Sequence, residues 1–91
     1  FSDTIALGAM EAAKELNLSV PDDLSIIGFD DIEVARLVGL TTMRQQLFET
    51  GVMGAEILLD TINNPDTEVR HILLPIELVV RQSTAPPPET V

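Results

Sequence analysis

The feature that most constrains the fold is a short apolar segment that ends abruptly in two carboxylates. Residues 24–29 read Leu-Ser-Ile-Ile-Gly-Phe, and Asp30 and Asp31 follow directly. A continuous apolar run of this length, rather than an alternation of apolar and polar residues, is typical of a buried parallel strand. Ligands of open α/β sheets bind just beyond the carboxyl ends of such strands. The acidic pair therefore indicates a candidate binding site.

Helices and strands are expected to alternate along the rest of the chain. Apolar residues at helical spacing predict three helices, over residues 4–16, 32–38 and 47–62. Further strands are expected over residues 40–44, 71–74 and 76–81, the last two separated by a proline. This order predicts an α/β fold, a partly parallel sheet flanked by helices.

Local signals mark the ends of these helices. Ser2 or Asp3 is expected to cap the first helix, and Asn17 to follow it in the left-handed conformation. Gly39 is expected to close the second helix. Two glycines inside the third helix, Gly51 and Gly54, each cost about 1 kcal/mol relative to alanine, which predicts close packing there.

Charge and composition exclude several classes of function. The 91 residues carry 15 acidic and 5 basic side chains, a net charge of -10, and no cysteine. Nucleic-acid binding depends on Lys and Arg neutralising phosphates, so this segment is not expected to bind DNA by itself. No apolar run approaches the roughly 18 residues of a membrane span. We expect no membrane partner, cofactor or metal.

Catalysis is not expected either. An acidic pair at a strand end occurs in phosphoryl-accepting receiver domains, which also need a strand-end lysine, but Lys14 lies on a predicted helix. His71 has no nucleophile and acid in a triad pattern. A glycosidase needs two facing carboxylates, whereas adjacent strand residues point to opposite faces. We therefore expect that the chain is not an enzyme.

Five blocks of sequence, in the same order, resemble the LacI/GalR family of bacterial repressors. The resemblance covers Phe1 to about Pro87. The blocks are Asp3-x-x-Ala6-x-Gly8-Ala9, residues 20–31, Leu40-Thr41-Thr42-x-x-Gln45, Gly51-x-x-Gly54-Ala55, and residues 74–84.

The resemblance implies a fragment of a two-lobed fold of the type I periplasmic-binding-protein-like class. Residues 1–85 would be the C-terminal portion of its effector (sugar)-binding domain and residues 86–91 a flexible tail. A complete member also has an N-terminal helix-turn-helix, and neither that region nor the first lobe matches this segment. Because the chain opens on Phe1 and a helix start, we expect it to begin inside a longer protein.

The resemblance also implies four effector-binding residues. Asp30 would accept hydrogen bonds from sugar hydroxyls, although it could instead cap the turn at Ile32, for which Asp31 is the expected cap. Gln45 would both donate and accept, unless it bonds only local backbone. Ser2 stands where the family usually has Asn, and the serine side chain is shorter than that of Asn and has one hydrogen-bond donor fewer. Leu47 would form an apolar wall, with core packing as its alternative.

A dimer interface is expected from Leu7, Met10, Leu37 and Val38, which match the region through which family repressors form two-fold dimers. The alternative is that they are ordinary core or scattered surface residues. The family usually has one or two prolines before Leu40, where this chain has Val38-Gly39.

Together these expectations describe the effector-sensing, dimerising part of a cytoplasmic LacI/GalR-type transcriptional regulator. A sugar or related small metabolite would change operator affinity allosterically, and operator DNA would be bound only by an N-terminal domain outside this segment. The alternatives are a periplasmic sugar-binding transport receptor and a truncated product without a complete pocket.

Overall fold

The computed structural model describes residues 2–88 and consists of two compact units. Unit 1 contains the residues up to Arg44 together with those from Glu77 onward, and unit 2 is the intervening segment, Gln45–Ile76.

The first helix of unit 1, α1 (Asp3–Glu15), has the predicted ends. The Ser2 hydroxyl accepts a hydrogen bond from the Ile5 amide at 3.2 Å, so Ser2 is the N-cap. Beyond the helix, Asn17 has φ 60°, the expected left-handed conformation. The second helix, α2 (Glu33–Val38), ends at Gly39 with φ 73°, also as predicted.

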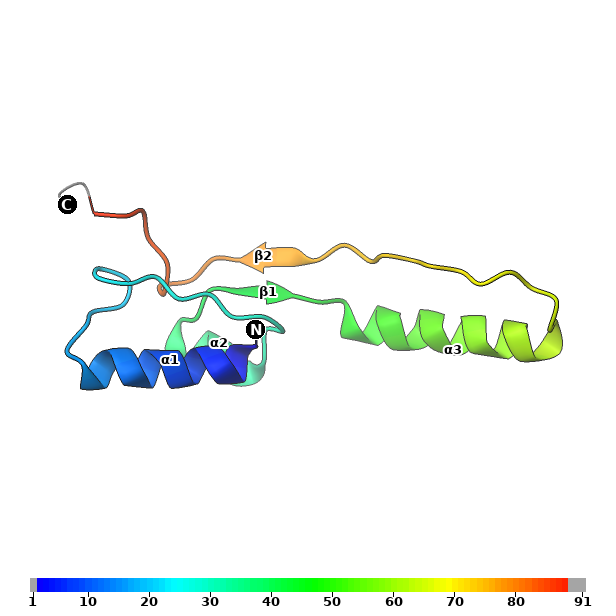
Figure 1. Cartoon of the computed structure of the whole chain (residues 1–91), viewed down its shortest axis with the longest axis horizontal. Helices are drawn as coiled ribbons and strands as arrows, with labels where there is room; N and C mark the ends of the chain where they lie inside the picture. The colour runs from blue at the N-terminus through cyan, green and yellow to red at the C-terminus, as the bar shows by residue number, and fades with distance from the viewer. Residues whose placement is uncertain (1, 89–91) are drawn as a thin grey trace. The chain divides into compact units, whose positions relative to one another are not determined.

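The regular sheet of unit 1 is a pair of short antiparallel strands, β1 (Thr42–Arg44) and β2 (Glu77–Val79) (Figure 1). Thr42 pairs with Val79, and Arg44 pairs with Glu77. Both strands lie within the segments predicted to be strands: the predicted segment 40–44 begins two residues before β1, and the predicted segment 76–81 extends beyond both ends of β2.

The predicted strand over residues 24–29 is parallel to the segment that leads into β1, but it is not a continuous strand. Isolated parallel bridges join Ile27 to Thr41 and Asp30 to Arg44. The Gly28 amide donates to the Thr41 carbonyl at 2.9 Å. Ile26 is buried but its neighbour Ile27 is half exposed, so the expectation that both faces of this segment are buried was wrong within the described residues.

A small core lies where both helices meet these extended segments. Its buried members come from α1, α2 and the two parallel segments, with Met10 and Val20 packed against them. In Figure 1, α1 and α2 lie on the same side of the two strands. The buried members are Ala6, Ile26, Ala35 and Leu40.

Unit 2 contains one helix, α3 (Leu47–Asn63), followed by an extended segment. The helix has the predicted bounds to within one residue, but none of its residues is buried. Among the described residues, the close packing expected at Gly51 and Gly54 is absent, because no atom beyond the neighbouring backbone of α3 lies within 4 Å of a Cβ built at either position. The strand expected over residues 71–74 does not form, since no neighbouring strand pairs with it among the described residues.

Substitution of Gly28 should test the packing of unit 1. A Cβ at Gly28 would overlap Asp3 Oδ1 and lie 3.0 Å from Leu40 Cδ2. We expect Gly28→Ala to lower the free energy of unfolding by about 1–3 kcal/mol, the usual cost of overpacking. Gly8→Ala is the matched control, because Gly8 lies in α1 with open space around it. This variant should have a free energy of unfolding about 0.5–1 kcal/mol higher than the wild type. Urea denaturation of both variants measures the difference, and equal stabilities would contradict the packing described.

Candidate functional site

The carboxylate of Asp3 is fully buried at the start of α1, where it joins three segments. Its Oδ1 accepts a hydrogen bond from the Thr42 hydroxyl at 2.6 Å, and its Oδ2 accepts one from the Ile32 amide at 2.8 Å. The Asp3 amide donates to the Phe29 carbonyl at 2.9 Å. The sequence suggested only a helix cap, whereas Asp3 fixes the turn that follows residues 24–29.

Asp30 lies in that turn, at the end of the predicted strand. The Asp30 amide donates to the Met43 carbonyl at 2.9 Å, and Asp30 is half buried. Asp30 and Asp31 have φ values of 119° and 60°. Two successive non-glycine residues with positive φ are uncommon and are often found at functional sites.

Asp31 does not cap α2, which corrects the sequence-based expectation. The N-cap of α2 is Ile32, without a side-chain hydrogen bond. The Asp31 carboxylate instead binds two guanidinium groups, accepting from Arg44 Nε at 2.7 Å and from Arg81 Nη2 at 2.8 Å. Hydrogen bonding by Arg44, supported by Arg81, holds the pKa of Asp31 below its usual value although partial burial opposes this.

Arg81 belongs to the segment after β2, which is bound to the strand segments by further contacts that the sequence did not reveal. Its Nη1 donates to the Leu40 carbonyl at 2.9 Å. Two residues later, the buried Ser83 hydroxyl donates to the Ile26 carbonyl at 2.6 Å and accepts from the Thr41 amide at 2.8 Å. Pairs of polar residues two positions apart, such as Arg81 and Ser83, are so common in sequences that this pair could not be recognised as a connection to the strand segments.

The four predicted effector-binding residues are divided between the two units. Ser2 and Asp30 lie in unit 1, where the bond from the Asp3 amide to Phe29 brings the start of α1 close to the strand end. Gln45 and Leu47 lie in unit 2. Leu47 is 61% exposed, so the alternative role in core packing does not apply within the described chain.

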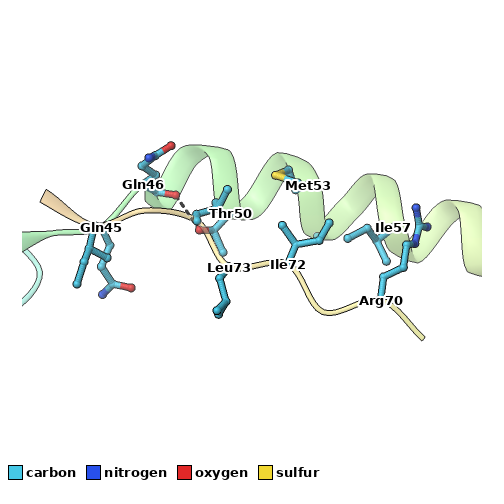
Figure 2. A pocket seen from close by; sticks show the side chains of 11 residues that line it. Gln45, Gln46, Thr50, Met53, Ile57, Arg70, Ile72 and Leu73 are labelled. Atoms are coloured by element: carbon cyan, nitrogen blue, oxygen red, sulfur yellow. Dashed lines mark hydrogen bonds between the residues drawn. The ribbon is translucent and has the colours of Figure 1, made fainter. Parts of the chain in front are cut away.

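Unit 2 contains a groove of about 340 Å³ between α3 and the segment of residues 70–76. Gln45 lies at this groove, and apolar side chains of α3 and of the extended segment line most of it. Figure 2 shows Ile57 and Ile72 on the facing sides, with Leu73 directed away from α3. Leu73 is 97% exposed.

The four predicted dimer residues differ in their surroundings. Met10 packs against the core of unit 1, which fits the alternative of an ordinary core residue. Leu37 and Val38 are exposed on α2, and Leu7 is half buried on α1. The dimer interface stays a prediction.

The segment that follows Ser83 returns to the beginning of residues 24–29. The Ser25 hydroxyl accepts from the Ala85 amide at 3.0 Å and lies 3.2 Å from the Ala85 carbonyl oxygen, to which it donates. Of the tail predicted over residues 86–91, residues 86–88 are exposed, and residues 89–91 lie outside the described residues.

Over residues 2–88, no group of three or more His, Cys, Asp or Glu side chains could hold a metal ion. Among the same residues, no helix has both the length and the apolar composition to cross a bilayer.

Comparison with known proteins gives consistent similarities. Residues 1–84 match the family model of a periplasmic binding protein-like domain. A ribose operon repressor of Haemophilus influenzae is 44% identical over 84 residues, which cover 90% of this chain and 25% of the repressor.

Solved structures of similar sequence share the fold. A LacI family transcriptional regulator from Enterococcus faecium with bound ribose has a TM-score of 0.81 and 39% identity, covering 94% of this chain and 33% of the regulator. The lac repressor dimer bound to operator and an anti-inducer has a TM-score of 0.79 and 35% identity, and the match covers 91% of this chain and 29% of the repressor chain. The chain thus spans about a quarter to a third of the length of these relatives.

Removal of the Asp3 carboxylate should destabilise unit 1 strongly. Asp3→Ala leaves the buried Thr42 hydroxyl and the part-buried Ile32 amide without their acceptor, and a buried group that loses its partner costs about 1–3 kcal/mol. We expect the free energy of unfolding to fall by roughly 2–4 kcal/mol in urea denaturation. Asp22→Ala, which removes an exposed carboxylate, should change it by less than about 0.5 kcal/mol. An Asp3→Ala variant as stable as the control would refute this role.

The ion pairs of Asp31 should make stability depend on pH in acid. Because the folded-state pKa of Asp31 is lowered, its stabilising contribution is complete above the unfolded-state pKa of about 3.9 and is lost as the pH falls through the folded-state value. Asp31→Asn should therefore be less stable than the wild type at pH 7, with a difference that narrows below about pH 4. Unfolding free energies measured from pH 7 to pH 2 test this, and a constant difference would contradict it.

Proposed function

The chain belongs to the family of periplasmic binding protein-like domains, and from that membership we propose that it senses a sugar effector within a LacI-type transcriptional regulator. In this proposal the chain is the C-terminal portion of the effector-binding domain. The length relation supports it, since the chain aligns with only about a quarter of the ribose operon repressor.

The observation that carries the proposal is the position of Asp30. Asp30 follows the parallel segment at the edge where open α/β sheets bind ligands, and it occupies the position whose counterpart in the resembling family contacts the effector. A carboxylate can accept hydrogen bonds from two neighbouring sugar hydroxyls, each contributing about 1.5–3 kcal/mol. Asp30 is therefore the proposed main effector contact.

Three further residues complete the proposed site. Gln45 would bond the effector through its amide, and Leu47 would form an apolar wall. Ser2 would contribute its hydroxyl proton, because the oxygen accepts from the Ile5 amide while the proton can still be donated.

Ribose is the first effector to test. The Enterococcus faecium regulator of similar structure contains bound ribose, and the similar Haemophilus influenzae protein is a ribose operon repressor. A pentose also suits a site with few aromatic groups, since the chain has only three aromatic residues and all are Phe.

DNA binding would belong to another part of the regulator. The segment has a net charge of -10, which opposes binding to phosphates. The similar lac repressor is a dimer bound to operator, and we propose a homodimer here too, with Leu7, Leu37 and Val38 at the interface and Met10 packed beneath it. Effector binding would then act on operator affinity through the dimer, a coupling of typically about 1–3 kcal/mol.

A periplasmic transport receptor is the alternative function. The repressors among the relatives favour regulation over transport. The complete coding sequence distinguishes the two, because a helix-turn-helix region supports the regulator and a cleaved signal peptide supports the receptor.

Substitution of Asp30 in the complete regulator tests the proposed site. Asp30→Ala should weaken ribose binding roughly 100-fold, the effect of about 2.7 kcal/mol of lost charge-assisted hydrogen bonding. Ribose at a concentration that saturates the wild type should then no longer change operator affinity. Calorimetry measures the binding, and a gel-shift titration measures the response.

Two controls separate a lost contact from a damaged fold. Asp30→Asn keeps a residue that tolerates positive φ while removing the charge, and it should also weaken binding. Asp66→Ala removes an exposed carboxylate of unit 2 and should leave binding unchanged. Undiminished ribose binding by both Asp30 variants would remove Asp30 from the site.

A further inference from the structure

Asp31 has a chemical environment different from that of its neighbour Asp30. Its side chain is 10% exposed, and each of its two oxygens accepts from a different guanidinium group. Arg44 lies on β1 and Arg81 follows β2, so one carboxylate connects the strand-end turn to both strands. An ion pair between exposed side chains contributes little to stability, but in these two bonds the Asp31 carboxylate is largely shielded from solvent.

The backbone at Asp31 needs such support. Asp30 and Asp31 both have positive φ, a backbone conformation that is strained for residues other than glycine. Such conformations persist only when surrounding contacts hold them. The turn is held on both sides, by the Asp30 amide bonded to Met43 and by the Ile32 amide bonded to Asp3. The residue between these two bonds is Asp31.

We propose that Asp31 is a positioning residue for the effector site: its bonds to Arg44 and Arg81 hold the left-handed turn that presents the Asp30 carboxylate. The inference rests on the proposed effector role of Asp30 and adds a second residue that acts through it. Asp31 does not need to touch the effector, because both of its oxygens are engaged by arginines.

Replacement by asparagine isolates this role. Asn keeps the shape of Asp and its tolerance of positive φ, but it loses the charge and can accept through only one oxygen. One guanidinium therefore loses its partner while the backbone preference is retained.

A double-mutant cycle in the complete regulator, with D-ribose as the probe, tests the proposal. We expect Asp31→Asn to weaken ribose binding at least tenfold. When Asp30→Asn is already present, the same change should weaken binding less than twofold, because the group that Asp31 positions has been altered. Asp60→Asn, which removes an exposed ion pair with Arg70, is the matched control and should change binding less than twofold. Equal losses in both backgrounds would mean that Asp31 stabilises the protein without positioning Asp30, and would overturn the proposal.

A second measurement keeps the test independent of the ligand. Hydrogen exchange of the Asp30 and Ile32 amides, followed by NMR, should be faster in Asp31→Asn than in the wild type, with the amides of α1 unchanged. If the wild type does not bind ribose, the proposed effector is wrong, and these exchange rates alone decide the positioning role. Unchanged exchange at both amides would overturn it, and faster exchange at those two alone would support it.

Discussion

The buried carboxylate of Asp3 is the contact on which unit 1 depends. Burial of a carboxylate is costly unless donors compensate it, and here two donors from distant segments do so. These bonds tie the start of α1 to β1 and to Ile32, the residue directly before α2. The need for space beside this carboxylate explains Gly28, where any side chain would collide with it. A residue that looks like one of two possible helix caps therefore fixes the geometry of the strand end.

The helices could be predicted from the sequence because their determinants are local. Apolar spacing, the Ser2 cap and the left-handed Gly39 each depend on residues within a turn or two, and α1, α2 and α3 form within one residue of the expected positions. The strands could not be predicted as well, because a strand requires a neighbour. Residues 24–29 have a partner on one side and form only isolated bridges, and residues 71–74 have none among the described residues.

The sequence predicted a binding site at the strand end that Asp30 and Asp31 occupy, and that site stays a prediction, but the helix-cap role expected for Asp31 was wrong. The adjacency of Asp30 and Asp31 indicated one ligand contact and one helix cap. The sequence around Asp31 does not predict its two ion-pair partners, because Arg44 is 13 residues away and Arg81 is 50 residues away. Charge counts cannot supply such pairs, since any of 15 acidic residues could meet any of 5 basic ones. The positive φ values are equally hidden, because Asp only tolerates that conformation and does not require it.

Under the proposed function, the same contacts limit how an effector signal could leave the site. Only Ile32 separates the ion-paired Asp31 from α2, and the Ile32 amide is bound to Asp3. At the other end of α2, the carbonyl of its C-cap residue Gly39 accepts hydrogen bonds from the Gln82 and Ser83 amides, each at 3.0 Å. A helix held at both ends cannot hinge freely about the turn. Movement at Asp30 would therefore reach Leu37 and Val38 by displacing α2 together with the strand segments. In a dimer whose interface has two stable arrangements, such a joint displacement could switch the interface from one arrangement to the other.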